Sequence, residues 1–229
     1  MFCHHCGTEV DAGAQFCKNC GQPVTGLPVG PAVVSTWAPS GRVQAGSTRW
    51  IGEGWRIVHA DLGMYVALTL VFFLLSSVPF IQGALIAGFH IYTMKKLMGR
   101  RAEFGDLFKG FNFFIPTMIA SILIGLFVFA GTILFIIPGL VIAAMYKFTY
   151  LFIIDKRMDF WPAMKASHAV VRNDYFGFTM FLILAFLVNV LGFLCLVVGL
   201  LVTVPVTFAA ITVAYREIVG FEPGTPDAY

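Results

Sequence analysis

The run that decides the fold is IPTMIASILIGLFVFAGTIL, residues 115–134, which contains no charged side chain. A helix of about 20 apolar residues is long enough to cross a hydrocarbon core of about 30 Å. A second apolar run, residues 138–154, begins shortly after the first one ends. The two runs therefore predict a pair of transmembrane helices joined by a short turn.

Four further runs are similar in length and composition to this pair, and they lie at residues 64–80, 82–98, 176–196 and 199–219. The chain is 12% charged and 59% hydrophobic, with a mean hydropathy of +0.84, whereas a soluble domain has about a quarter of its residues charged. We therefore expect an all-α polytopic membrane protein with about six transmembrane helices in three hairpins. This region would cover residues 49–220 and leave a short C-terminal tail, residues 221–229.

The charges around these runs predict the orientation of the chain. The turns inside the hairpins are uncharged, whereas the two segments between hairpins are basic. The basic residues of these segments are Lys95, Lys96, Arg100, Arg101 and Lys109 in the first and Lys156, Arg157, Lys165 and Arg172 in the second. Basic loops stay in the cytosol, so we expect both termini there and the chain in a cytoplasmic (inner) membrane. Alternatively, hairpins with such apolar turns enter the membrane and return without crossing it.

The three hairpins look like copies of one unit. Three stretches align without gaps, each with a pair of small residues, at residues 83–90, 139–146 and 205–212. Ahead of each hairpin lies a segment that mixes aromatic and charged residues, at residues 50–61, 104–114 and 160–175. Such mixed faces are typical of amphipathic helices in the headgroup region, and small pairs allow close helix contacts. The sequence thus predicts an interfacial helix and a hairpin, repeated three times; chance similarity among apolar strings is the alternative.

Four of the five cysteines lie near the N-terminus, at Cys3, Cys6, Cys17 and Cys20, in two Cys-x-x-Cys-Gly sequences. Four thiolates fill the tetrahedral shell of Zn²⁺ and leave no open position for catalysis. We therefore predict a structural zinc ion in a zinc ribbon over residues 1–24, followed by a flexible linker over residues 25–48. Iron is an alternative metal, and two disulfides are the alternative in an oxidising compartment.

The second of these sequences, Phe16-Cys17-Lys18-Asn19-Cys20-Gly21, and the first knuckle resemble the short N-terminal zinc ribbons of bacterial and archaeal proteins. The resemblance implies metal binding but names no partner. Although zinc ribbons often touch nucleic acid, Glu9 and Asp11 outweigh Lys18 here, which opposes binding to phosphates. We expect a protein partner in the cytosol and no nucleic acid.

The membrane region, roughly residues 50–220, resembles a bacterial superfamily that includes the membrane domain of some glycerophosphodiester phosphodiesterases and several uncharacterised integral membrane families. The residues that carry this resemblance are Ile136-Ile137-Pro138-Gly139-Leu140, Trp161-Pro162-Ala163-Met164-Lys165-Ala166-Ser167 and Asn173-Asp174-Tyr175-Phe176. The resemblance implies a multi-pass helical fold. It implies no phosphodiesterase activity, because the catalytic barrel of those enzymes is absent from this sequence.

Three polar residues fall inside the apolar runs: His90, Lys147 and Asn189. A lysine at the centre of a spanning helix costs about 2.5–3.5 kcal/mol on insertion scales, which makes Lys147 a candidate for a functional site near the midplane. Alternatively, its side chain reaches the interface by snorkelling. For His90 and Asn189 the alternative is a hydrogen bond between helices.

No grouping of serine, histidine and acidic residues indicates catalysis. We therefore expect a zinc-binding, non-enzymatic scaffold or regulatory protein that sits in the lipid bilayer and contacts a cytosolic protein through its ribbon. A transporter or lipid-handling protein with a midplane site is the second hypothesis. A membrane enzyme acting on lipid headgroups is the third, and the sequence leaves the oligomeric state open.

Overall fold

The computed structural model describes residues 44–78, 80–195 and 198–222. The chain divides into two compact units, residues 1–35 and 36–229, and the described residues all belong to the second unit. The predicted zinc ribbon and most of the predicted linker therefore lie outside the described residues.

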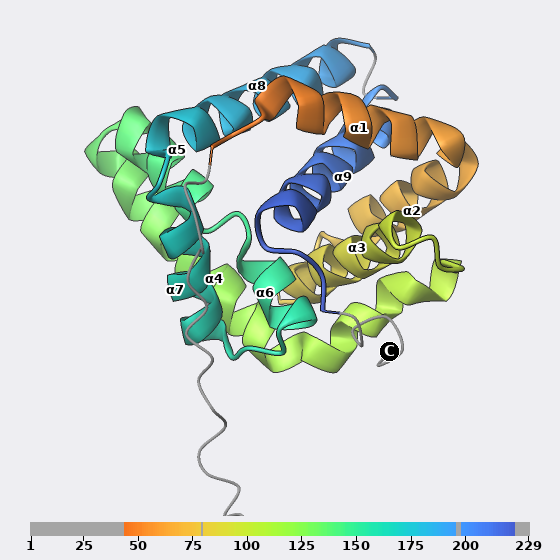
Figure 1. The fold of residues 1–229 in the computed structure, drawn as a ribbon, viewed down its shortest axis with the longest axis horizontal. Helices are drawn as coiled ribbons and strands as arrows, with labels where there is room; N and C mark the ends of the chain where they lie inside the picture. Colours follow the sequence, from red (N-terminus) through yellow and green to blue (C-terminus); the bar gives the residue numbers. More distant parts are fainter. Residues whose placement is uncertain (1–43, 79, 196–197, 223–229) are drawn as a thin grey trace, which may run out of the picture. The chain divides into compact units, whose positions relative to one another are not determined.

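Every regular element in the described residues is a helix, and none of them is a strand, which confirms the all-helical prediction for this part of the chain. The elements in chain order (Figure 1) are α1 (Ser47–Ala60), α2 (Leu62–Leu75), α3 (Gln82–Leu97), the 3₁₀ helix η1 (Phe104–Phe113), α4 (Phe114–Leu134), α5 (Ile136–Met145), α6 (Thr149–Asp155), α7 (Phe160–Val171), α8 (Tyr175–Leu194) and α9 (Leu200–Ile218).

Four helical stretches of the described residues are long and apolar enough to cross a membrane: η1 with α4, α5 with α6, α8, and α9. This finding indicates a membrane protein. The expected count of six is not confirmed, because α2 has only 14 residues and α3 only 16. Helix α3 also has Lys95 and Lys96 in its last turn, which shortens its apolar part. A fifth crossing results only if α1 and α2, which meet at an angle of 100°, form one bent span.

The three predicted interfacial segments are helical, as α1, η1 and α7. Aspartates mark where two helices begin: the Phe160 amide donates to Asp159 Oδ1 over 2.8 Å, and the Gly177 amide donates to Asp174 Oδ1 over 2.8 Å. These side chains satisfy amides that have no partner inside the helix. The depth of these helices in a membrane stays a prediction.

The second helix of each predicted hairpin packs against an amphipathic helix of another unit. Helix α3 packs on η1, α5 and α6 pack on α7, and α9 packs on α1. Glycines allow the closest of these contacts. A Cβ atom on Gly54 of α1 would lie 2.8 Å from the Val206 carbonyl oxygen, and one on Gly88 of α3 would overlap the Leu107 carbonyl group. The cyclic order of contacts is the one expected of three related units, and the repeat itself stays a prediction.

Ion pairs reinforce two of these contacts. Asp106 of η1 accepts from Lys95 Nζ of α3 over 2.7 Å and is 2.6 Å from Lys109 Nζ. Arg216 of α9 is 2.8 Å from Glu53 of α1. Because Asp106 is almost completely buried, loss of both lysines would leave a desolvated charge, which is strongly destabilising. The amphipathic helices are thus tied to the ends of α3 and α9.

A third cluster holds the chain that follows α9. The Glu222 amide donates to Asp155 Oδ1 over 2.9 Å, and the Glu222 carboxylate is 2.6 Å from Lys156 Nζ. Burial of Lys156 disfavours its charged form, yet the carboxylates of Glu222 and Asp155 raise its pKa above the ordinary value. The end of α6 therefore anchors the described part of the C-terminal segment.

Candidate functional site

The site begins with a break in the predicted fourth span. Helix α5 ends at Met145 and α6 begins at Thr149. Ser167 of α7 fills the gap, because its hydroxyl donates to the Met145 carbonyl over 2.6 Å and accepts from the Phe148 amide over 3.1 Å. A side chain inserted into the helical hydrogen-bond ladder interrupts the helix. Lys147 therefore lies in a turn between two short helices.

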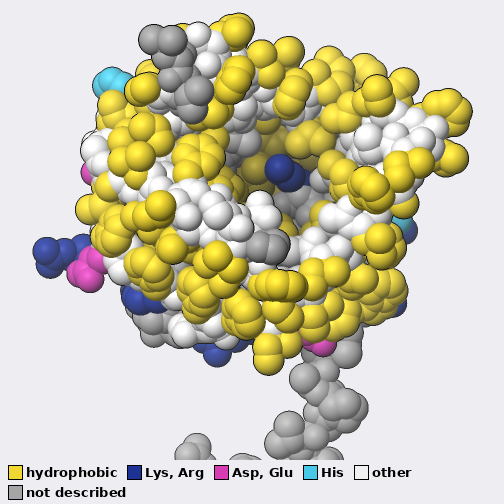
Figure 2. Space-filling view, turned by 180° about the vertical axis from the view of Figure 1, so that it is seen from behind, with side chains coloured by type: hydrophobic (Ala, Val, Ile, Leu, Met, Phe, Trp, Pro, Cys, Tyr) yellow, Lys and Arg dark blue, Asp and Glu magenta, His cyan; other side chains and the backbone are white. Residues whose placement is uncertain are grey.

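This break opens onto a cavity of about 240 Å³. Side chains from α3, α4, α5, α6 and α9 and from the break line it: Ile86, His90, Ile124, Ala143, Tyr146, Lys147, Tyr150, Phe208 and Ile211. Figure 2 shows a hollow in a largely hydrophobic face, with a basic side chain on its floor. Lys147 is the one basic residue among those that line the cavity.

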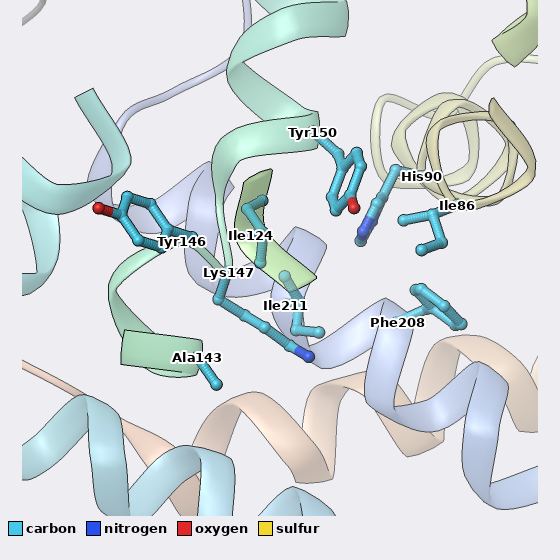
Figure 3. Close-up of a pocket in the computed structure, with 9 residues that line it drawn as sticks. All are labelled: Ile86, His90, Ile124, Ala143, Tyr146, Lys147, Tyr150, Phe208 and Ile211. Atoms are coloured by element: carbon cyan, nitrogen blue, oxygen red, sulfur yellow. The ribbon is translucent and has the colours of Figure 1, made fainter. Parts of the chain in front are cut away.

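The Lys147 side chain is half-buried and extends beside Ile211 (Figure 3). Its ammonium group makes no hydrogen bond or ion pair with a residue that the structure describes. A charge held away from water costs several kcal/mol unless an opposite charge or hydrogen bonds offset the loss of hydration. The cavity is therefore suited to a negatively charged ligand.

His90 lies in the same cavity but has a partner of its own. Its Nδ1 is 2.8 Å from the Thr212 hydroxyl, which in turn donates to the Phe208 carbonyl over 2.9 Å. Because the threonine proton is used in that bond, we assign Nδ1 as the donor to Thr212. His90 is almost completely buried, which disfavours a charged ring and leaves Nε2 as an acceptor. His90 thus contributes a neutral ring to the cavity and joins α3 to α9.

The other polar groups of the cavity are partly engaged. Tyr150 shares a hydrogen bond of 2.9 Å with Ser121. The Tyr146 hydroxyl points away from the other labelled residues in Figure 3. No group of three or more histidine, cysteine or acidic side chains that could hold a metal ion occurs in the described segments. The cavity therefore offers one cation on mostly apolar walls.

Asn189 does not line this cavity. Its side-chain amide donates to the Ala185 carbonyl and to the Thr207 hydroxyl, both over 2.8 Å. The bond to Thr207 connects α8 with α9 and matches the alternative of an interhelical hydrogen bond. Of the three polar residues predicted for a midplane site, the structure brings His90 and Lys147 together and leaves Asn189 apart. Their roles stay predictions.

Sequence reasoning did not assign Tyr150, Ala143 or Ser167 to the site. The sequence did contain a partial indication of the site, because the alignment of the three hairpins places His90, Tyr146 and Thr212 at one equivalent position. The structure brings these positions together, since His90 and Tyr146 line the cavity and Thr212 holds His90. Ser167 carried no such signal.

A second cavity of about 580 Å³ adjoins the first at Ala143, which lines both. We call it the α5 groove. It lies among α4, α5 and α8, and its lining consists of Val128, Thr132, Ile136, Gly139, Leu140, Ala143, Ile183, Phe186 and Leu187. Thr132 donates its hydroxyl proton to the Val128 carbonyl over 2.8 Å. The groove is therefore apolar along its length.

Comparison with known proteins identifies the class of the N-terminal domain. Residues 2–24 match the zinc-ribbon domain family. The match implies a structural zinc ion, for which Cys3, Cys6, Cys17 and Cys20 are the predicted ligands; they lie outside the described residues. No curated protein and no solved structure matches the chain. The resemblance to the phosphodiesterase membrane-domain superfamily gains no support and stays a prediction.

The chain thus combines a zinc-ribbon domain with a helical unit of membrane-protein character.

Proposed function

We propose that this chain is a zinc-binding integral membrane protein whose helical unit binds a membrane-derived anionic ligand at Lys147. The observation that carries this proposal is Lys147, a half-buried residue that lines a cavity and whose ammonium group has no hydrogen bond or ion pair among the described residues. A protein that used Lys147 only to close its own structure would be expected to pair it. The proposal therefore follows the lipid-handling hypothesis for the helical unit.

The ribbon supplies the scaffold or regulatory part of the proposed function. Its four cysteines would hold the structural zinc, and it would contact a cytosolic protein rather than a nucleic acid. In this proposal both termini lie on the cytosolic side of a cytoplasmic (inner) membrane. The charge distribution supports that orientation, because the segments between the hairpins are basic and the turns inside the hairpins carry no charge.

Two observations favour ligand binding over catalysis. His90 uses Nδ1 to hold Thr212 and so has only Nε2 for a ligand. The nine residues that line the cavity include no serine, cysteine or carboxylate, so a hydrolytic triad would lack both its nucleophile and its acidic member there. A transporter would use the same site, and the broken helix at Lys147 favours this version, because many transporters place their sites at interrupted helices.

The Lys147→Met variant tests the proposal through thermal unfolding of the detergent-purified protein with hexadecanoate, dodecyl phosphate or phosphatidylglycerol. A ligand at about 100 times its Kd stabilises the folded state by about 2.7 kcal/mol. We expect at least one of these anions to stabilise the wild type, Lys147→Arg to retain most of the effect, and Lys147→Met to lose it. Without ligand, Lys147→Met should be as stable as the wild type or more so, because it removes an uncompensated charge.

Lys165→Met is the matched control. Lys165 lies on α7, over the Trp161 ring at 5.5 Å, and does not line the cavity. Its replacement removes one positive charge of the chain but leaves the cavity as it is. Equal stabilisation of the wild type and Lys147→Met by every anion would contradict binding at Lys147.

A further inference from the structure

We propose that the ligand is a long-chain carboxylate, with its carboxylate at Lys147 and its hydrocarbon chain in the α5 groove. This inference rests on the proposed function, since it names the chemical class of the ligand for the same site. The observation behind it is that two spaces, the cavity with one cation and the apolar groove, meet at a single small side chain, Ala143.

The spacing along α5 forms the path between the two cavities. Gly139 and Ala143 are four residues apart on one face of α5, and Lys147 follows in the turn after that helix. Gly139 lines the groove, Lys147 lines the cavity and Ala143 lines both. Two small residues thus lead to the cation. A larger residue at 143 would separate the two spaces.

The groove fits one hydrocarbon chain. Its volume of about 580 Å³ falls inside the range of about 300–1,000 Å³ that is typical of pockets for one small molecule. Its lining includes no charged residue. Several of its walls are exposed, with Ile136 71%, Phe186 63% and Leu187 50% exposed, so the groove is open along one side. In a bilayer these walls face lipid tails, which a hydrocarbon chain of the ligand could replace without leaving a polar group unpaired.

The cavity fits a small head with one negative charge. Lys147 is its only cation, so a dianionic phosphate monoester would keep an uncompensated charge. The Tyr150 hydroxyl is already bonded to Ser121, and His90 Nδ1 is bonded to Thr212. A glycerol headgroup would therefore bring several hydroxyls into a cavity with few free partners, which is unfavourable. A carboxylate needs only the ammonium group and a water molecule.

Equilibrium binding of saturated carboxylates of eight to sixteen carbons to the full chain in amphipol tests this inference. In the wild type we expect saturable binding whose affinity rises by up to about threefold to fourfold for each methylene that enters the groove. In Leu187→Trp the indole should fill part of the groove, so the ratio of hexadecanoate to octanoate affinity should fall at least tenfold. Because the ratio is taken within each variant, any change at the Lys147 site affects both ligands equally and cancels.

A second measurement requires no variant. Hexadecanoic acid with a photoreactive diazirine at mid-chain should label peptides of α4, α5 and α8 in the wild type, and excess hexadecanoate should suppress the labelling. Labelling spread evenly over other helices, or unaffected by the competitor, would overturn the assignment of the groove.

The outcomes separate this inference from the proposed function. If dodecyl phosphate or phosphatidylglycerol binds in a Lys147-dependent manner and no carboxylate does, the ligand class is wrong and the anion site stands. If carboxylates bind through Lys147 with the same chain-length dependence in the wild type and Leu187→Trp, the chain lies outside the groove. If no anion binds in a Lys147-dependent manner, both proposals fail.

Discussion

Replacing both Cys3 and Cys17 with serine is expected to reduce bound zinc from one ion per chain to almost none. Each replacement removes one thiolate from a different knuckle, so neither half of the tetrahedral site stays intact. Zinc binding to small domains of this kind supplies on the order of 10 kcal/mol, which is also the free energy that folds them. Elemental mass spectrometry measures the bound zinc, and limited proteolysis measures whether the N-terminal residues stay folded.

Cys195→Ser is the matched control, because Cys195 is exposed at the end of α8 in the other unit of the chain. It should keep its zinc. If the double variant bound one zinc ion per chain as tightly as the wild type, the four cysteines could not be the ligands.

Replacing Gly88 with alanine is expected to destabilise the helical unit by about 1–3 kcal/mol, the range typical of overpacked cores. The new methyl group would overlap the Leu107 carbonyl oxygen, a backbone atom that cannot move away by rotation. The contact is tight from both sides, because a Cβ atom on Gly110 would overlap the Ala84 carbonyl oxygen. The ion pair between Lys95 and Asp106 also holds η1 in place. Thermal unfolding in detergent, followed by circular dichroism, measures the effect.

Gly125→Ala provides the comparison. Gly125 lies inside α4, and a Cβ atom there would meet nothing within 4 Å. Alanine favours helix over glycine by up to about 1 kcal/mol, so this variant should be as stable as the wild type or slightly more stable. Equal stability of the two variants would contradict the close contact between α3 and η1.

Hydropathy and charge were sufficient to predict the helices but not how many of them are long enough to span. The run at residues 115–134 corresponds to α4 (Phe114–Leu134) almost residue for residue, because an uninterrupted apolar run leaves few alternatives. Helix α2 ends earlier than expected, at Leu75, before Ser76 and Ser77. When the residues beyond such a point are still apolar, composition alone does not show whether the helix continues.

The candidate site depended on tertiary contacts that sequence spacing does not carry. Lys147 could be recognised as unusual from its place in an apolar run, but the break beside it is made by Ser167, 22 residues from Met145 along the chain. Asn189 was equally unusual in the sequence, and its side-chain NH₂ group donates to Ala185 on its own helix and to Thr207 on α9. Polar residues in apolar runs can therefore be identified from the sequence, whereas which of them share a site depends on which helices pack together.

The most direct test of binding at Lys147 is native mass spectrometry of the intact chain released gently from its membrane. The wild type should carry the mass of one zinc ion and of one small anionic amphiphile, and Lys147→Met should carry the zinc ion alone. An identical set of bound amphiphiles on the wild type and on Lys147→Met would contradict the account.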